Sequence, residues 1–147
     1  MVEVTQALAF MEQQYAQFVA LAHDGRTPYR WQFRLMRYVA QEGRWPDRIS
    51  VPTASGKTSV IDIHVFLNAM VGLAEDESRK EHEILSCLPL RRIPRRLALT
   101  VNRRSLVDDQ FDEADGLCGK IHTSESMIHY KEGLKLRAGV HDGLPHT

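Results

Sequence analysis

The sequence predicts an α/β fold in which parallel β-strands are flanked by α-helices. The first observation is the order of elements around one loop: the strand candidate "RISVP" (48–52), the polar loop "TASGKTS", and a stretch with helical periodicity from Val60 onward. Strand, tight loop and helix form the frame of a phosphate-binding loop. The second observation is "RRLALTVN" (95–102), which is apolar on both faces, as buried parallel strands are. We therefore expect a right-handed βαβ unit.

Two helices are expected before this unit. The first covers residues 6–23, with Thr5 as its cap and Gly25 after its end, because apolar residues recur every three or four positions: Leu8, Met11, Tyr15, Phe18 and Ala22. In the second, Thr27 can cap the start, Gly43 ends the helix, and the inner stripe is formed by Phe33, Met36 and Ala40. Residues 1–45 would form a helical part that precedes the α/β part at 46–147.

The remaining segments give weaker patterns. Residues 75–90 read as a charged connection with a short helical piece at 80–87. A third long helix is expected at 106–121, with Ser105 as its cap. The last stretch, 122–147, predicts a short helix followed by an edge strand near Leu134–Arg137.

Composition limits the classes of function. The 147 residues carry no net charge, which argues against a protein that binds nucleic acid through its whole surface, although residues 91–104 hold six arginines. No apolar run approaches the roughly 18–20 residues of a membrane span. The two cysteines, Cys87 and Cys118, have neither disulfide nor metal spacing. We expect a soluble protein of the cytoplasm, without a membrane partner.

The loop itself has the chemistry for binding ATP and Mg²⁺. Backbone N–H groups from Ala54 to Thr58 would converge on a phosphate at the start of the following helix. Gly56 permits close approach, Lys57 reaches the β- and γ-phosphates, and the Thr58 hydroxyl is a Mg²⁺ ligand. The general pattern has glycine where Val51 stands. The complete set of expected nucleotide contacts in the loop is Thr53, Ala54, Ser55, Gly56, Lys57, Thr58 and Ser59.

The form "PTASGKT" resembles motif I of superfamily 2 helicases, with Ala54 in place of a glycine. "PYRWQ" resembles the upstream element of that superfamily in which a glutamine hydrogen-bonds adenine. This resemblance assigns adenine contact to Gln32, whose amide has both a donor and an acceptor, and base stacking to Tyr29 or Trp31. "LALTVNRRSLVDDQ" occupies the place of motif Ia, which implies contact with the nucleic-acid backbone.

The residues expected at that backbone are Asn102, Arg103 and Arg104, at the carboxyl end of the second predicted strand. Taken together, these motifs, over roughly 25–115, resemble the N-terminal part of the type I CRISPR-associated helicase/nuclease, in the lineage whose helicase opens the chain. The resemblance implies part of a first RecA-like (P-loop NTPase) domain. It also implies an ATP-driven translocase on single-stranded DNA, acting with a downstream nuclease portion and a CRISPR surveillance complex.

The letters D-E-A-D, at 112–115, do not supply the acidic motif of such a helicase. That motif follows four apolar residues of a buried strand, whereas the preceding residues here are Asp108, Asp109, Gln110 and Phe111. The helical period of 106–121 instead places the acids on a solvated face. The pairs His23-Asp24 and His141-Asp142 are interpreted as chance rather than as a metal-dependent nuclease. His64 is interpreted as a packed histidine.

The sequence therefore predicts an ATP-binding N-terminal fragment of a DNA helicase, which would not hydrolyse ATP alone because no acidic motif and no second RecA-like domain are present. Two alternatives remain open. One is a stand-alone, non-catalytic module that binds nucleotide or nucleic acid. The other is a small P-loop phosphotransferase, which should also show an acid at the end of an apolar strand and an arginine-rich lid; we find neither.

Overall fold

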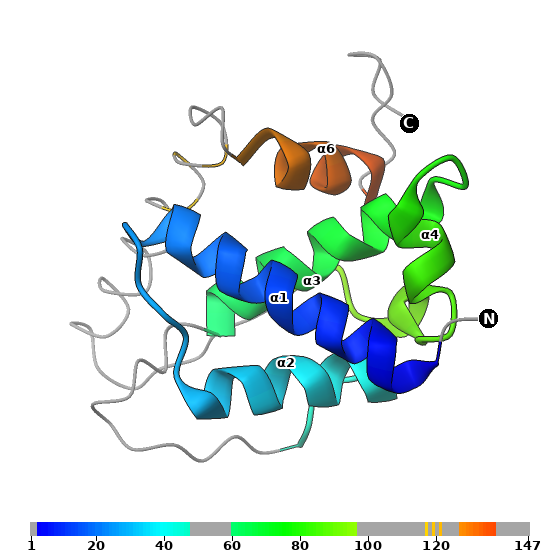
Figure 1. Cartoon of the computed structure of the whole chain (residues 1–147), viewed down its shortest axis with the longest axis horizontal. Helices are drawn as coiled ribbons and strands as arrows, with labels where there is room; N and C mark the ends of the chain where they lie inside the picture. The colour runs from blue at the N-terminus through cyan, green and yellow to red at the C-terminus, as the bar shows by residue number, and fades with distance from the viewer. Residues whose placement is uncertain are drawn as a thin grey trace.

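A computed structural model describes residues 3–47, 60–96, 117, 119, 121 and 127–137. Within these residues the chain forms helices only (Figure 1). The elements, in chain order, are α1 (Val4–Ala22), α2 (Arg30–Glu42), α3 (Val60–Glu75), α4 (Lys80–Leu85), the 3-10 helix η3 (Leu90–Arg92) and α6 (Ile128–Arg137). In this part of the chain, no helix has the length and apolar character needed to cross a bilayer.

The central element is α3. Eleven of its 16 residues are buried, so it is apolar on nearly every side rather than along one stripe. A helix that is apolar on every side must be surrounded by other parts of the protein. Figure 1 shows α1 and α2 on one side of α3, α6 on the opposite side, and α4 at its carboxyl end. The helices expected in 1–45 therefore share one hydrophobic core with α3, α4 and α6.

The predicted α/β fold, a partial RecA-like domain with parallel strands, is wrong. The described residues contain no strand and are predominantly helical. A helix that flanks a sheet buries one face and exposes the other, whereas α3 is enclosed by helices. The segments expected as strands, 48–52 and 97–102, lie outside the described residues; Arg95 and Arg96, the start of the second one, are not in a strand.

The helix expectations are largely confirmed. The helix expected at 6–23 runs over Val4–Ala22, with the Glu3 N–H donating to the Gln6 side chain at 3.2 Å, so it starts before Thr5. The second helix ends at Gly43, whose φ of 72° is the left-handed conformation that glycine adopts readily. The short piece expected at 80–87 is α4. Of the helix expected at 106–121, only residues 117, 119 and 121 are described, and they are helical.

Aromatic rings join α1, α3 and α6. The Phe18 ring lies 5.0 Å from the Tyr130 ring and 5.6 Å from the Phe66 ring, measured between centroids. Tyr15 contacts Phe66 at 5.2 Å. These side chains are fully buried. The Phe18–Tyr130 pair is edge-to-face, an arrangement that adds about 0.5–1.5 kcal/mol beyond area burial, and the other two pairs are tilted. The aromatic cluster therefore fixes the packing of three helices that are distant in sequence.

Two glycines allow α3 and α6 to cross closely. A Cβ atom built on Gly72 would collide with the Gly133 carbonyl oxygen, and one on Gly133 would collide with the Ala69 carbonyl oxygen. The edge strand predicted near Leu134–Arg137 is therefore wrong: these residues continue α6. Gly133 lies in α6 and, having no side chain, lets this helix approach α3 closely.

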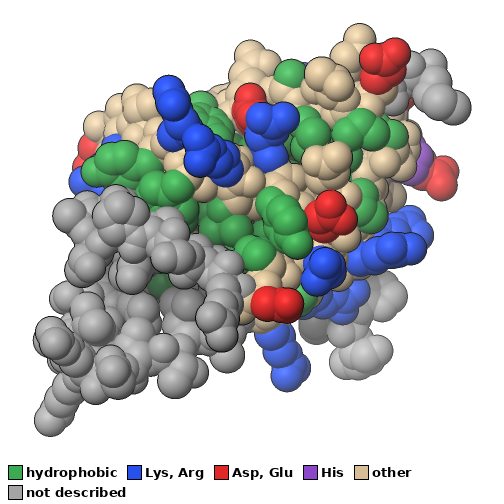
Figure 2. Space-filling model, turned by 90° about the horizontal axis from the view of Figure 1, so that it is seen from below, with side chains coloured by type: hydrophobic (Ala, Val, Ile, Leu, Met, Phe, Trp, Pro, Cys, Tyr) green, Lys and Arg blue, Asp and Glu red, His purple; other side chains and the backbone are tan. Residues whose placement is uncertain are grey.

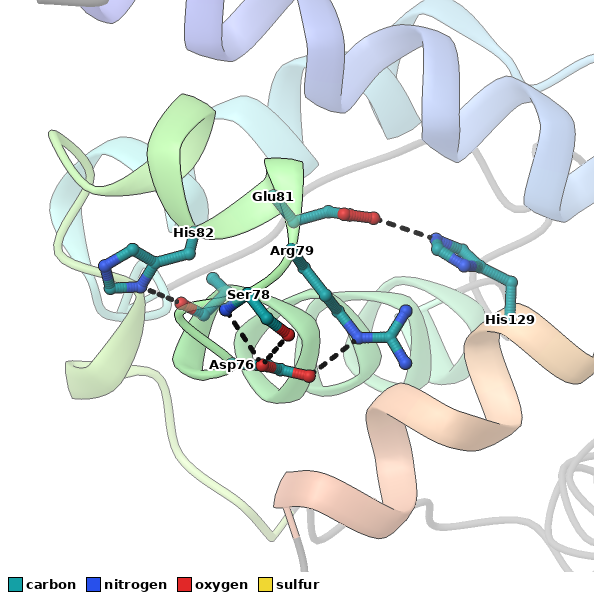
Figure 3. A network of polar contacts seen from close by, with 7 residues as sticks. Asp76, Ser78, Arg79, Glu81, His82 and His129 are labelled. Carbon is teal, nitrogen blue, oxygen red and sulfur yellow. Dashed lines mark hydrogen bonds and ion pairs between the residues drawn. The ribbon is translucent and has the colours of Figure 1, made fainter.

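Polar contacts attach α4 to its neighbours (Figure 3). The Asp76 carboxylate accepts hydrogen bonds from Ser78 and Arg79, which shape the turn between α3 and α4. His82 Nδ1 lies 2.7 Å from the Ala74 carbonyl oxygen. The buried Glu81 reaches His129 of α6 at 3.3 Å. These contacts fix the short α4 between the last turn of α3 and the first turn of α6.

Candidate functional site

The predicted phosphate-binding loop ends where the described part of α3 begins. Residues 53–59, including Lys57 and Thr58, lie outside the described residues. The helix that the motif requires after the loop is present and starts at Val60. The amino-terminal end of a helix carries partial positive charge and free N–H groups, which suit a phosphate. The start of α3 is therefore the described part of the candidate site.

A buried carboxylate lies in the first turn of α3. Asp62 is 2% exposed, and its Oδ2 lies 2.7 Å from Nε2 of His23, the residue that follows α1. An imidazole N–H that donates to a carboxylate gives a charge-assisted hydrogen bond when the histidine is protonated. This contact fastens the end of α1 to the beginning of α3, across 39 positions of sequence.

Two polar atoms near this contact have no hydrogen-bond partner within the described residues. They are Oδ1 of Asp62 and the hydroxyl of Tyr15, and both are buried. Burial, together with the nearby Asp62 carboxylate, raises the pKa of Tyr15 well above its usual value of 10. Unpaired buried polar atoms destabilise a fold by about 1–3 kcal/mol each. The beginning of α3 is therefore a place where packing is not optimised for stability.

The residues expected to bind adenine lie at the start of α2. Tyr29 is 51% exposed, so its ring is accessible to a ligand. Gln32 is 4% exposed, and its amide oxygen accepts the Tyr29 backbone N–H at 2.9 Å, which caps α2. Its acceptor is thus occupied by the backbone. Because the Gln32 side chain is buried, Tyr29 is the accessible residue of this predicted adenine element in the described structure.

These two helix starts lie at the same end of the molecule. The His23–Asp62 contact brings the connection between α1 and α2, residues 23–29, against the start of α3. Figure 1 shows this connection on the side of the molecule where α2 and α3 both begin. The residues predicted to bind adenine thus lie at the end of the molecule where the described part of α3 begins.

The remaining residues singled out in the sequence lie partly outside and partly within the described residues. Asn102, Arg103 and Arg104 lie outside the described residues, as do residues 112–115. His64 is packed, as expected: its Nε2 lies 3.2 Å from the Arg95 carbonyl oxygen, and burial lowers its pKa below 6.5. The described ranges contain no group of three His, Cys, Asp or Glu side chains that could hold a metal ion.

The contact between Asp62 and His23 was not predicted from the sequence. The available signal was Asp62 itself, an acid in the apolar run "SVIDIHVFL". A lone carboxylate in such a run is almost never buried without a partner. The partner could not be found from sequence, because it lies on a different helix.

Comparison of the chain with protein-family models, with curated proteins and with solved structures finds no match in any of the three. The motifs and the geometry of this chain are therefore the basis on which its function is proposed.

Proposed function

We propose that the chain binds ATP with Mg²⁺ at the beginning of α3, through the loop 53–59. The observation that carries the proposal is the meeting of two helix starts: α3 begins at Val60, directly after Gly-Lys-Thr-Ser, and the His23–Asp62 contact holds the segment before α2 beside it. Phosphates would lie on the loop, with Lys57 as the cation and Thr58 as the metal ligand. The base would lie toward Tyr29 and Gln32.

Binding without turnover is the expected activity of the isolated chain. Hydrolysis in P-loop enzymes needs an acid that holds Mg²⁺ and a group that positions the attacking water. The sequence offers no acid after an apolar strand, because the D-E-A-D letters follow a polar segment. The resemblance of the motifs supports a wider role as the ATP-binding part of a DNA helicase of CRISPR defence.

The helical architecture favours a second candidate, a stand-alone module that binds nucleotide without driving a motor. The described residues show no RecA-like sheet, which a helicase motor would require. Release of inorganic phosphate from ATP, measured with and without single-stranded DNA, separates the two. Stimulated release supports the motor, and no release under either condition supports the binding module.

The direct test of binding is titration of a fluorescent ATP analogue against the intact chain. Lys57→Ala should weaken affinity at least tenfold, because a hydrogen-bonded charge contributes about 1.5–3 kcal/mol. Lys80→Ala removes the same charge from the exposed first residue of α4 and should leave affinity unchanged. Equal affinity of the wild type and Lys57→Ala would contradict the proposed site.

A further inference from the structure

One face of α2 is a row of arginines. Arg30, Arg34 and Arg37 are spaced by four and three residues, which places them on one side of the helix, and all three are exposed. The opposite side is buried in the core through Leu35, Met36, Val39 and Ala40. The row from the first to the third arginine extends about 10 Å along the helix, at about 1.5 Å per residue.

The row continues beyond the helix. Arg44 follows Gly43 and is exposed. Gly43 also packs against η3: a Cβ atom on it would lie 3.0 Å from the Cβ of Arg92, which is exposed as well. A residue from a distant part of the sequence therefore joins the same end of α2. We call Arg30, Arg34, Arg37, Arg44 and Arg92 the arginine face.

The charges of the arginine face are poorly neutralised. Arg37 pairs with Glu12 of α1 at 3.2 Å, but both side chains are largely exposed, at 52% and 37%, so the pair is weak. The other four arginines form no ion pair with any described residue. Residues 26–44 contain five arginines against one acid, Glu42, in a chain whose net charge is zero. Positive charge is thus concentrated on this region.

The side chains of the arginine face are suited to a chain of phosphate groups, such as a phosphodiester backbone. Guanidinium groups bind phosphate through two parallel hydrogen bonds, and the face contains arginine without lysine. Tyr38, 36% exposed on the same helix, offers a ring on which a base can stack. Figure 2 shows the side of the molecule on which α2 lies, where basic side chains stand beside exposed apolar ones, with some acidic side chains among them.

We propose that the arginine face, with Tyr38, binds the backbone of single-stranded nucleic acid. This site consists of other residues than the loop 53–59, and its binding does not require bound nucleotide. A membrane surface fits less well, because an interfacial helix inserts large apolar side chains. The exposed large apolar residues of the described chain are Val4, Tyr29, Tyr38 and Ile128, and no aliphatic one lies on α2.

The test is fluorescence anisotropy of a labelled 20-nucleotide single strand of mixed sequence, with the intact chain and no ATP. The variant Arg30→Gln/Arg34→Gln/Arg92→Gln should raise the dissociation constant at least tenfold. The control Lys80→Gln/Lys131→Gln/Lys135→Gln also loses three positive charges, but outside the arginine face. It should raise the dissociation constant less than threefold. A plot of the logarithm of the binding constant against the logarithm of salt concentration should also become less steep, by about 2, in the arginine variant alone. Each of the three lost phosphate contacts contributes about 0.7 to this slope.

A second pair of variants tests stacking. Tyr38→Ala should weaken binding several-fold, whereas Tyr38→Phe, which keeps the ring, should bind like the wild type. Circular dichroism establishes that each variant folds. Lys57→Ala should bind the strand unchanged, so failure of the nucleotide site and failure of the arginine face give different results.

Four results would overturn the proposal. The first is an equal loss of affinity in the arginine and lysine variants, and the second is no binding of the strand by the wild type at 50 mM salt. The third is tighter binding to the matching duplex than to the single strand. The fourth is tighter binding to vesicles containing phosphatidylserine than to the single strand.

Discussion

The two halves of α3 differ in how well their polar groups are satisfied. In the carboxyl-terminal half, Asn68 donates to the Pro94 carbonyl oxygen and accepts from Arg137, and Arg137 also donates to the Ile93 carbonyl oxygen and to Glu75. In the amino-terminal half, one oxygen of Asp62 and one ring nitrogen of His64 are buried without a partner in the described residues. The difference indicates that one half is built for stability and that the other tolerates unpaired groups beside a candidate site.

The largest effect is expected at the crossing of α3 and α6. Gly72→Ala places a methyl group against the Gly133 carbonyl oxygen, a backbone atom that cannot rotate away. We expect a loss of about 3 kcal/mol or more in the free energy of unfolding, at the upper end for overpacking. Urea unfolding measures it.

The matched control is Gly119→Ala, where an added Cβ meets nothing within 4 Å. This helical position should gain up to about 1 kcal/mol. If both alanine variants keep wild-type stability, the close crossing of α3 and α6 is wrong.

The next effect concerns Arg137, which is 9% exposed. Arg137→Met removes the partner of the buried Ile93 carbonyl oxygen and of the Asn68 side chain, and should cost about 2–3 kcal/mol. Arg79→Met breaks a half-buried pair with Asp76 that lies at the surface, and should cost less than about 1 kcal/mol. Similar losses in the two variants, measured by thermal unfolding, would remove the contrast between the halves of α3.

Removing the hydroxyl group from two buried tyrosines should give smaller changes in the free energy of unfolding, with opposite signs at the two positions. The Tyr130 hydroxyl donates to the Gln14 carbonyl oxygen at 3.2 Å, so Tyr130→Phe should cost about 1 kcal/mol. The Tyr15 hydroxyl is buried without a partner, so Tyr15→Phe should be neutral or stabilising by up to about 1 kcal/mol. Chemical unfolding of both variants decides this. A clear loss in Tyr15→Phe would show that its hydroxyl is bonded.

The smallest effect is a pH dependence at His64. Burial lowers the pKa of this imidazole in the folded protein below 6.5. The unfolded chain therefore binds the proton at higher pH than the native protein does, and stability should fall as pH decreases below about 6.5. His64→Gln should show a flatter decline between pH 7 and 5 in urea unfolding. A steeper decline of stability in the variant would mean that folding raises, rather than lowers, the pKa of His64.

Sequence patterns predicted the helices well and the architecture badly. The periodicity of Leu8, Met11, Tyr15 and Phe18 located α1, and Gly43 marked the end of α2 correctly. The first strand was inferred from the loop motif that follows it, and the second from a run that is apolar on both faces. Periodicity alone does not reveal whether a sheet or a set of helices covers an apolar helix such as α3.

The nucleotide site stays a prediction, because the loop 53–59 lies outside the described residues. The loop and Gln32 were predicted from local order along the chain, and the helix described from Val60 agrees with one element of that order. The His23–Asp62 contact and the joining of Arg92 to α2 depend on packing between distant segments. The close crossing of α3 and α6 at Gly72 and Gly133 depends on the same kind of packing between distant segments.

Hydrogen exchange with and without MgATP tests the central claim most directly, because it reports where a ligand acts along the whole chain. We predict slower exchange of backbone amides in residues 23–32 and at the start of α3, residues 60–64, and no change in residues 68–75. Lys57→Ala should abolish the difference. Unchanged exchange at saturating MgATP, or protection confined to the carboxyl-terminal half of α3, would contradict the account.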